Sequence, residues 1–515
     1  MSKYFAINLG PISTSFSMAR KPREFWAASY MFSFLMECIL EKLDGHNGEW
    51  TLISPYYEKS KERTGVGLYP DRCFYLVNKE VTLEALSKEV NSLLDELLKD
   101  YADKVGLDIG IVKNYFCIMV ACEEYETESV AIKGLNATLN YMELNCLTSN
   151  LEDFKTEMFN VYESICGYLR RTSNYDTNRK DIIPLVKLAF GKKEFTTGSL
   201  EDIAKANVEK LEYSRQKYVC IVQADGDGMG SIVTSEKMEG QLNDFSKKLM
   251  DFAKDACVLI KDFGGLPIYA GGDDLLFIVP VTGDESKDSV WRGKTVFDLL
   301  DTIDDKYSLV QSDVRAKKID GKTSMSYGVA MIYDKYPLYE AWKTAAAMLF
   351  AKAKKVKGKN AIAVKLRKSS GSDLEFVFSK DSEMYKKFQK LVQNTPKESI
   401  VSAVAHKVRA NDIVLDTFPK DEAFTGLNDR LSTFFEKIVD VEDKSDENKL
   451  YMDSAREALE EIFKAVVTDR IEAEEEAKKK GGKYDAPKDR EVIVRHFYSM
   501  LRIAKFIKGE ELKDE

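Results

Sequence analysis

We predict an α+β protein built from two domains of alternating strands and helices, followed by a helical region. Between residues 216 and 372, apolar strand segments alternate with amphipathic helices, and residues 1–145 contain a fainter version of the same order. After residue 372 the apolar spacing is helical and the composition is charged. With 515 residues, 44% of them hydrophobic, the chain can form three or four domains that each have a core.

The first domain is expected over residues 1–145 and begins with a strand at Tyr4–Leu9. Gly10-Pro11 and an amphipathic helix follow, and then a helix near Leu83–Leu98 and a strand at Tyr115–Cys122. The second domain is expected to begin in the same way, with a strand, a glycine turn and a helix.

The second domain is expected over residues 216–372. A strand from Tyr218 ends in the acidic turn ADGDGMG. The next segment has apolar residues at steps of three and four, typical of one helix face: Leu242, Phe245, Leu249, Phe252, Ala256, Leu259 and Phe263. The hairpin YAGGDDLLFIVPV, a helical insertion, the strand SMSYGVAMIY, a helix from about Pro337 and the strand GKNAIAVKL complete it. This is the order of a palm domain, a ferredoxin-like fold with helices on one face of a mainly antiparallel sheet.

Two helical regions flank the second domain. Residues 146–215 have largely helical spacing and are expected to link the two palms. Residues 373–515 are expected to form a C-terminal helical bundle, with apolar residues at helical intervals such as Leu459, Ile462 and Phe463.

Four carboxylates stand at the ends of two predicted strands. Asp225 and Asp227 end the first strand, and Asp273 and Asp274 follow the Gly-Gly pair of the hairpin. If the strands are neighbours, these like charges converge, which is costly unless hard cations neutralise them. Two Mg²⁺ or Mn²⁺ ions there would form the apparatus of nucleotidyl transfer. We expect Asp225, Asp273 and Asp274 to be catalytic metal ligands, assisted by the Gly226 carbonyl and Asp227.

Glycines around these aspartates predict a nucleotide site, because they let backbone amides approach a polyphosphate and permit a tight hairpin. The residues expected to contact nucleotide are Gly226, Asp227, Gly228, Met229, Gly230, Gly271, Gly272, Ser324, Ser326 and Lys359. Each motif alone has a simpler explanation: GGDD as a surface turn, DGDG as a turn or calcium loop, the serines as structural, and Lys359 as a solvated lysine. Their joint occurrence at strand ends favours the nucleotide site.

Four places in the chain together resemble one known family. They are LGPISTSFSMARKPREFWAASYMFSFL near the N-terminus, GLYPDRCF at Gly67–Phe74, the pair ADGDGMG and AGGDD, and SYGVAMI with the later AK…GKNAI. The chain is similar there to the large polymerase–cyclase subunit of type III CRISPR effector complexes, on the Cmr (III-B) side. Diguanylate cyclases share the GGD-type hairpin, but nothing else in the sequence looks like them.

The resemblance implies an activity and a set of partners. Members of this family make cyclic oligoadenylate second messengers from ATP when target RNA is bound, and some instead join AMP to S-adenosylmethionine. The first palm is similar to the family's degenerate palm, because Gly10 and Ser13 stand near the positions of Asp225 and Asp227. The implied partners are the other complex subunits, guide RNA and target RNA, with the C-terminal bundle packing on small helical subunits.

The chain also departs from the family pattern. Many members begin with an HD nuclease domain, but the first palm strand starts at Tyr4 and none of the three histidines is followed by Asp. We expect neither this nuclease nor a structural zinc, because the eight cysteines include no CxxC pair. Cysteines such as Cys220, inside apolar strands, are expected to be core thiols.

Composition limits the cellular setting. No apolar run is long enough to span a membrane and no signal peptide is visible, so a cytoplasmic location is expected. The net charge of −9 disfavours strong RNA binding by this chain alone, and partner subunits are expected to supply most of it. Two alternatives to the complex-bound enzyme remain: a scaffold without catalysis, and a cyclase that acts alone.

Overall fold

The computed structural model describes residues 1–45, 48–59, 64–146, 154–173, 184–190, 199–208, 210–319, 322–396, 400–420, 423–439, 445–479 and 488–509. The chain divides into two compact units. The first comprises Met1–Asn207, Ile221–Ser326 and Lys335–Lys343, and the second comprises Val208–Cys220, Tyr327–Asp334 and Thr344–Glu515. In the described part, no helix has the length and apolar character needed to cross a bilayer.

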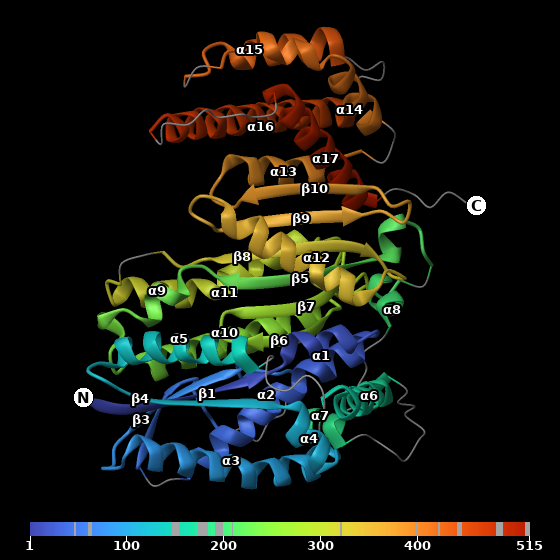
Figure 1. Ribbon diagram of the computed structural model, residues 1–515. Coiled ribbons are helices and arrows are strands. Elements are labelled where there is room, and N and C mark those ends of the chain that lie inside the picture. The colour runs from blue at the N-terminus through green and yellow to red at the C-terminus, as the bar shows by residue number, and fades with distance from the viewer. Residues whose placement is uncertain are drawn as a thin grey trace. The chain divides into compact units, whose positions relative to one another are not determined.

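A four-stranded antiparallel sheet opens the first unit (Figure 1). Its strands are β1 (Ser2–Gly10), β2 (Trp50–Ser54), β3 (Arg72–Val77) and β4 (Cys117–Tyr125), in the order β2-β3-β1-β4. The central strand β1 is buried over its last seven residues, as expected for an apolar strand between two neighbours. With its helices, this order is the ferredoxin-like arrangement that the sequence predicted.

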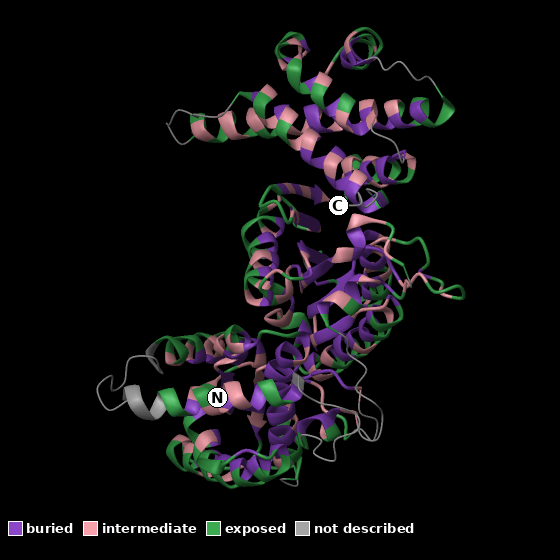
Figure 2. Cartoon of the chain, turned by 90° about the vertical axis from the view of Figure 1, so that its right-hand side faces the viewer, coloured by how far each residue is buried: buried purple, intermediate pink, exposed green. Residues whose placement is uncertain are grey.

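Helices lie between and after these strands in the sequence. They are α1 (Ile12–Met18), α2 (Pro22–Asp44), α3 (Leu83–Val105), α4 (Ile109–Tyr115), α5 (Glu128–Cys146), α6 (Phe154–Ser173), α7 (Pro184–Phe190) and α8 (Leu200–Ala204). Helix α2 is buried on nearly every side, which matches its apolar sequence and makes it the core helix of this region (Figure 2). Helix α3 is capped by the Thr82 hydroxyl and ends at Gly106, which has a left-handed φ of 73°.

The second sheet has six strands in the order β10-β9-β8-β5-β7-β6. They are β5 (Tyr218–Gly226), β6 (Leu266–Gly271), β7 (Asp274–Pro280), β8 (Met325–Tyr333), β9 (Ala361–Arg367) and β10 (Asp373–Ser379). In the first unit its helices are α9 (Met229–Val233), α10 (Leu242–Asp262) and α11 (Val296–Ala316). Helix α10 buries the apolar face that the sequence predicted, and Gly264 follows it at a φ of 93°.

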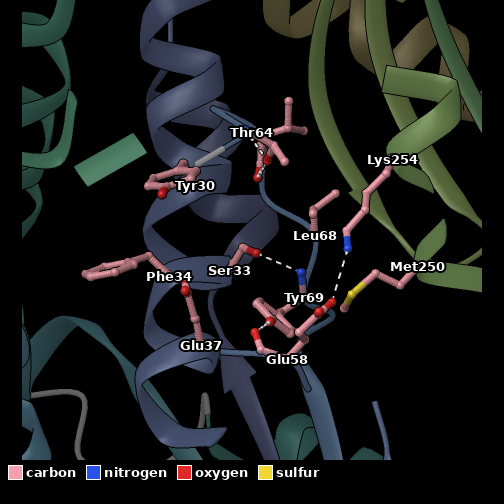
Figure 3. A pocket seen from close by; sticks show the side chains of 11 residues that line it. Tyr30, Ser33, Phe34, Glu37, Glu58, Thr64, Leu68, Tyr69, Met250 and Lys254 are labelled. Atoms are coloured by element: carbon pink, nitrogen blue, oxygen red, sulfur yellow. Dashed lines mark hydrogen bonds and ion pairs between the residues drawn. The ribbon is translucent and has the colours of Figure 1, made fainter. Parts of the chain in front are cut away.

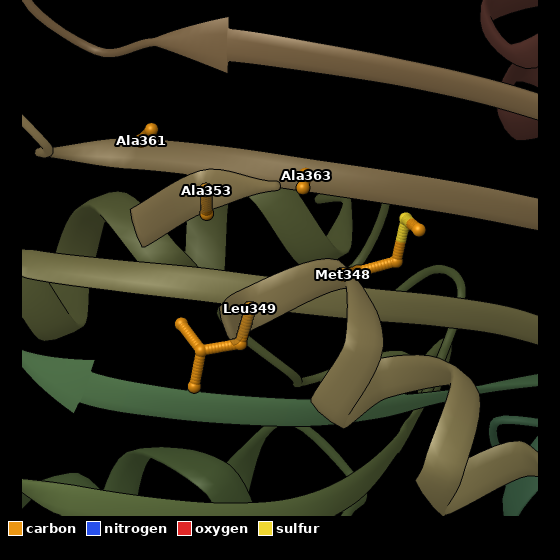
Figure 4. Packing of buried hydrophobic residues seen from close by; sticks show 5 residues of the cluster. All are labelled: Met348, Leu349, Ala353, Ala361 and Ala363. Carbon is orange, nitrogen blue, oxygen red and sulfur yellow. The ribbon is translucent and has the colours of Figure 1, made fainter. Parts of the chain in front are cut away.

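The second unit continues from β8 into the helical C-terminal region. Its helices are α12 (Leu338–Ala351, whose first six residues belong to the first unit), α13 (Glu383–Asn394), α14 (Ile400–Ala410), α15 (Leu427–Phe434), α16 (Asp446–Lys479) and α17 (Asp489–Gly509). Met348 and Leu349 of α12 pack with Ala353, Ala361 and Ala363 in a small core (Figure 4). The alanines allow the helix to lie close to β9.

Three local predictions need correction. Strand β4 begins at Cys117 rather than Tyr115, because Tyr115 ends α4 and its buried ring places the hydroxyl against Ser15. Helix α3 runs seven residues beyond Leu98, to Val105. Residues 373–379, predicted to be helical, form strand β10, which pairs antiparallel with β9 through alternating buried residues.

Candidate active site

The two acidic turns are brought together by neighbouring strands. Strand β5 lies beside β7 in the sheet, as the sequence predicted. Asp225 is the next-to-last residue of β5, Asp273 stands in the turn before β7, and Asp274 is the first residue of β7. All three carboxylates therefore lie at the same end of two adjacent strands, within the first unit.

The GGDD turn is a two-residue hairpin. Gly271 pairs with Asp274, which leaves Gly272 and Asp273 as the central residues. Gly272 has a φ of 73°, the left-handed value that a type II′ turn needs at its first central position. Gly271 has a different reason: a β-carbon there would collide with the Tyr269 hydroxyl. Both glycines are thus required by the shape of the hairpin.

Asp273 reaches across to the end of β5. A β-carbon on Gly226 would stand only 2.5 Å from Oδ2 of Asp273 and 3.0 Å from the Tyr307 hydroxyl. Tyr307 is fully buried, and its hydroxyl shares a 2.7 Å hydrogen bond with Thr323. Gly226 therefore has to be glycine so that the Asp273 carboxylate can lie against the backbone.

The three carboxylates act on one another electrostatically. Surrounding protein atoms, and then the negative charges of Asp273 and Asp225, raise the pKa of Asp274 well above its usual range. Asp274 is exposed to solvent, so water weakens the effect of burial on its pKa. We therefore consider repulsion among the carboxylates to be the decisive cause. The nearby Asp225 carboxyl group thus adds to the effects of burial and of Asp273 on the pKa of Asp274.

Asp227 points into the protein interior. It is 2% exposed, and its Oδ2 accepts hydrogen bonds from the Ser324 and Ser326 hydroxyls at 2.7 and 2.8 Å. Its backbone amide donates to the Ser324 carbonyl at 2.7 Å. Ser326 is completely buried. These three residues tie the turn after β5 to the start of β8, and nucleotide contact by any of them stays a prediction.

The turn that follows contains the remaining glycines. Gly228 has a φ of 77°, and a β-carbon there would stand 3.1 Å from the Lys322 carbonyl. Helix α9 starts directly afterwards with Met229 and Gly230, and Gly230 is exposed. Amides in a first helical turn have no acceptor within the helix, so contact of Met229 and Gly230 with phosphate stays a prediction.

Lys359 lies in the second unit. It is exposed on the turn before β9 and has a φ of 56°, and its amide donates to the Val356 carbonyl at 2.8 Å. Its predicted reach to a triphosphate is not tested by this geometry.

The donor atoms of the carboxylate cluster suit hard divalent ions. Carboxylate and carbonyl oxygens are the ligands that Mg²⁺ and Mn²⁺ prefer, and Gly226 leaves open the space that a β-carbon would fill. Across the described ranges, no three His, Cys, Asp or Glu side chains are already arranged to hold an ion. The cluster therefore offers donor atoms that suit a divalent ion.

Asp71 is a carboxylate that the sequence pattern did not single out. It directly precedes β3, and burial raises its own pKa. After burial and the charges of Asp273 and Asp225, the charge of Asp71 is a further cause that raises the pKa of Asp274. The neighbouring Arg72 side chain is bound to Asn136 at 2.8 Å. Asp71 lies in the segment GLYPDRCF, but only the folded chain brings that segment close to the carboxylate cluster.

Comparison with known proteins gives two matches to models of related families. Residues 218–363 match the model described as Cas10/Cmr2, second palm domain. Residues 4–140 match the model described as CRISPR-associated protein Cmr2, N-terminal. The two matches together cover more than half of the 515 residues.

A curated relative and two solved structures agree with these matches. The CRISPR system Cmr subunit Cmr2 of Pyrococcus furiosus is 29% identical over 182 residues, which are 30% of this chain and only 19% of that protein. The type III-B Cmr-beta complex bound to cognate target RNA contains a chain with a TM-score of 0.55 and 10% identity, covering 87% of this chain and 80% of that one. A Csm1–Csm4 cassette in complex with pppApA gives a TM-score of 0.50 and 12% identity, over 89% of this chain and 69% of that one. The two structures show a shared fold.

Proposed function

Because the chain belongs to the Cas10/Cmr2 family, we propose that it is the nucleotidyltransferase subunit of a type III CRISPR complex. It would convert ATP into a nucleotide second messenger when target RNA is bound. One observation carries the proposal: Asp225 at the end of β5 lies beside Asp273 and Asp274 of the neighbouring hairpin, so that three carboxylates are crowded at the same end of adjacent strands. Such crowding is unfavourable for the apoprotein and suits a site built for cations.

The carboxylates and one carbonyl would hold the metal ions. Asp225, Asp273 and Asp274 supply the side-chain oxygens, and the Gly226 carbonyl is a further ligand. Two divalent ions in such a site lower the pKa of an attacking 3′-hydroxyl and stabilise charge on the α-phosphate and the leaving pyrophosphate.

The surrounding residues would orient these groups. Asp227, held by Ser324 and Ser326, fixes the turn after β5 and so the position of Asp225. The amides of Gly228, Met229 and Gly230 are proposed to contact phosphate oxygens. Gly271 and Gly272 shape the hairpin that presents the aspartates, and Lys359 is proposed as a positive charge for the triphosphate.

Partners and product are inferred from relatives. The Cmr-beta complex was solved with target RNA, and the Csm1–Csm4 cassette holds pppApA, a linear adenosine dinucleotide. By analogy we propose that this chain works with other Cmr subunits, guide RNA and target RNA, and that ATP is its substrate. A cyclic oligoadenylate is the first product to test, and an AMP conjugate of S-adenosylmethionine is the second.

Labelled ATP provides the test. The assembled complex, with guide and target RNA, is incubated with ATP and Mg²⁺ or Mn²⁺, with and without S-adenosylmethionine, and products are identified by mass spectrometry. We expect Asp273→Ala combined with Asp274→Ala to reduce product by more than about 100-fold. Asp288→Ala, which changes an exposed aspartate outside the site, should leave product unchanged.

Each alternative makes a different prediction. A product that appears only with S-adenosylmethionine would identify the conjugate. Turnover by the isolated chain without RNA would indicate an enzyme that acts alone. Absence of any product from the intact complex, or full activity of the double variant, would exclude the proposed catalysis and favour a scaffold.

A further inference from the structure

A segment of the first palm lies along the edge of the sheet that carries the GGDD hairpin. We call residues 64–71 the strap; it has the sequence TGVGLYPD. Gly67 of the strap forms a parallel bridge with Tyr269 of β6, and its carbonyl accepts a 3.0 Å hydrogen bond from the Ala270 amide. Because β6 is the last strand in the sheet order, the strap covers an edge that would otherwise expose unpaired backbone groups.

The opposite side of the strap is held by helix α2. The Ser33 hydroxyl accepts a 2.9 Å hydrogen bond from the Tyr69 amide, and the Trp26 indole donates to the Gly65 carbonyl at 2.8 Å (Figure 3 shows the Ser33 contact). A β-carbon on Gly67 would stand 2.7 Å from the Ser33 β-carbon. Only glycine allows the strap to approach both the helix and the strand.

Helix α10 also contacts this region. The Lys261 ammonium donates to the Thr64 carbonyl at 2.7 Å. A cavity of about 50 Å³ lies between α2, the strap and α10, lined among others by Glu37, Leu68 and Met250. This volume has room for only a few waters, which is too little for a nucleotide.

The residue bonded to the strap, Ala270, precedes Asp273 by three positions and Asp274 by four. Ala270, which is bound to Gly67, is followed by Gly271, Gly272, Asp273 and Asp274. The Tyr269 hydroxyl lies against Gly271, so the side chain of the bridged residue also restrains the hairpin. A shift of the strap would therefore move β6 and the hairpin together.

We infer that Ser33 and Gly67 are positioning residues, which hold the GGDD hairpin at the distance from Asp225 that the reaction needs. This inference rests on the proposed function. It gives the first palm an indirect part in catalysis, because the first palm would hold the hairpin of the second in place. If the strap only packed the two palms together, loosening it would lower stability without changing the geometry of the metal ligands.

Ser33→Ala tests the inference, with Ser29→Ala as the matched control. Both serines lie on α2, one turn apart, and each is 4% exposed. The structure gives no hydrogen bond from Ser29 to strap residues 64–71, whereas Ser33 holds the Tyr69 amide. In the full-length chain, amide hydrogen exchange over residues 266–280 should become about fivefold faster in Ser33→Ala, the effect of losing one hydrogen bond. Ser29→Ala should exchange like the wild type.

The choice of metal separates positioning from stability. Mg²⁺ demands near-ideal octahedral geometry, so displaced carboxylates should reduce Mg²⁺-supported turnover of the assembled complex more than Mn²⁺-supported turnover. We expect Ser33→Ala to reduce Mg²⁺-supported turnover about tenfold, an effect of the size that small misplacements of reacting groups produce. Equal losses with the two ions, or unchanged exchange in the hairpin, would overturn the inference.

Gly67→Ala is a stronger variant of the same test. Its added methyl group must displace the strap, so both effects should exceed those of Ser33→Ala. Gly45→Ala, at the end of the same helix, adds a methyl group with ordinary 3.6 Å contacts and should change neither measurement. If the wild-type complex makes no product with either ion, the proposed function fails, while the exchange measurement still decides whether the strap holds the hairpin.

Discussion

The two palms share one strand order but differ in what their hairpins carry. The first sheet has the order β2-β3-β1-β4, and the second contains β6-β7-β5-β8 in the equivalent places. Their first strands, β1 and β5, each have nine residues and end in glycine, at Gly10 and Gly226. The same backbone plan therefore holds a cluster of carboxylates in only one copy.

The connection between the second and third strands accounts for the difference. In the second palm it is the two-residue turn of Gly272 and Asp273, which keeps Asp273 and Asp274 at the end of the strands, beside Asp225. In the first palm it spans residues 55–71, and its last residue, Asp71, acts electrostatically on the second palm. The longer connection supplies the strap, so the first palm contributes to the site of the second. The two palms share one fold, and the length of the connection between their second and third strands determines whether it presents metal ligands or supplies the strap.

The largest expected effect comes from changing the equivalent glycines. Gly226→Ala should reduce turnover of the assembled complex by about 100-fold or more, because the new methyl group would stand 2.5 Å from Asp273 Oδ2 and displace a metal ligand. Gly10→Ala should leave turnover within about twofold, because no atom lies within 4 Å of the position that its β-carbon would take. Steady-state rates with Mg²⁺ measure both. Equal losses would show that the two strand ends do the same work.

Most of the second palm could be predicted because its signals are local. The spacing of Leu242, Phe245 and Leu249 specifies α10, and the Gly-Gly pair specifies a tight turn before Asp273. The adjacency of the two acidic turns followed from the palm order, and the sheet confirms it. Patterns with a period of two or about four residues are readable without the fold.

The remaining features depend on contacts between distant residues. Asp227 looked like a partner of Asp225, but its side chain turns inward because Ser324 and Ser326, about 100 residues later, supply buried hydroxyls. The strap has no strand pattern of its own, and its bridge to Tyr269 forms only when the palms meet. Such tertiary pairing cannot be read from local propensity.

Asp71 offers a smaller test of the contribution of the first palm. Burial raises the pKa of Asp71, whereas the neighbouring Arg72 favours its charged form. Asp71→Asn removes this charge, which acts on Asp274, so divalent ions should bind the cluster less tightly. We expect Mn²⁺ affinity to fall about threefold to fivefold, a magnitude typical of one partly screened charge. Isothermal titration of the chain with Mn²⁺ measures it, and Asp103→Asn, at an exposed position on α3, is the control. Unchanged affinity in Asp71→Asn would mean that the second palm supplies the relevant charge by itself.

The smallest expected effect concerns a second contact between the palms. Glu239, in the second palm, accepts hydrogen bonds from the amides of Glu128 and Ser129 at the start of α5, at 2.7 and 3.3 Å. The Glu128 carboxylate lies beside it, and its Oε1 is buried without a hydrogen-bond partner within the described residues. Burial, and then the charge of Glu239, raise the pKa of Glu128 above its ordinary value of 4.5.

The sign of the pH effect follows from this direction. A carboxyl group whose pKa is higher in the folded state binds more protons when folded, so it lowers stability as the pH rises through that pKa. The helix dipole would favour a negative charge at this end of α5, but Glu239 already occupies the amides, and the raised pKa shows that repulsion and burial outweigh it.

Glu128→Gln should therefore increase the free energy of unfolding at pH 7 by about 0.5–1 kcal/mol. Well below pH 4.5 the Glu128 carboxyl group is largely neutral in both the folded and the unfolded state, so the stability gain from Glu128→Gln should disappear. Urea unfolding of the two proteins at pH 7 and pH 4 measures this, with Glu126→Gln, an exposed neighbour, as the control. A loss of stability at pH 7 would mean that the Glu128 charge helps to hold the two palms together.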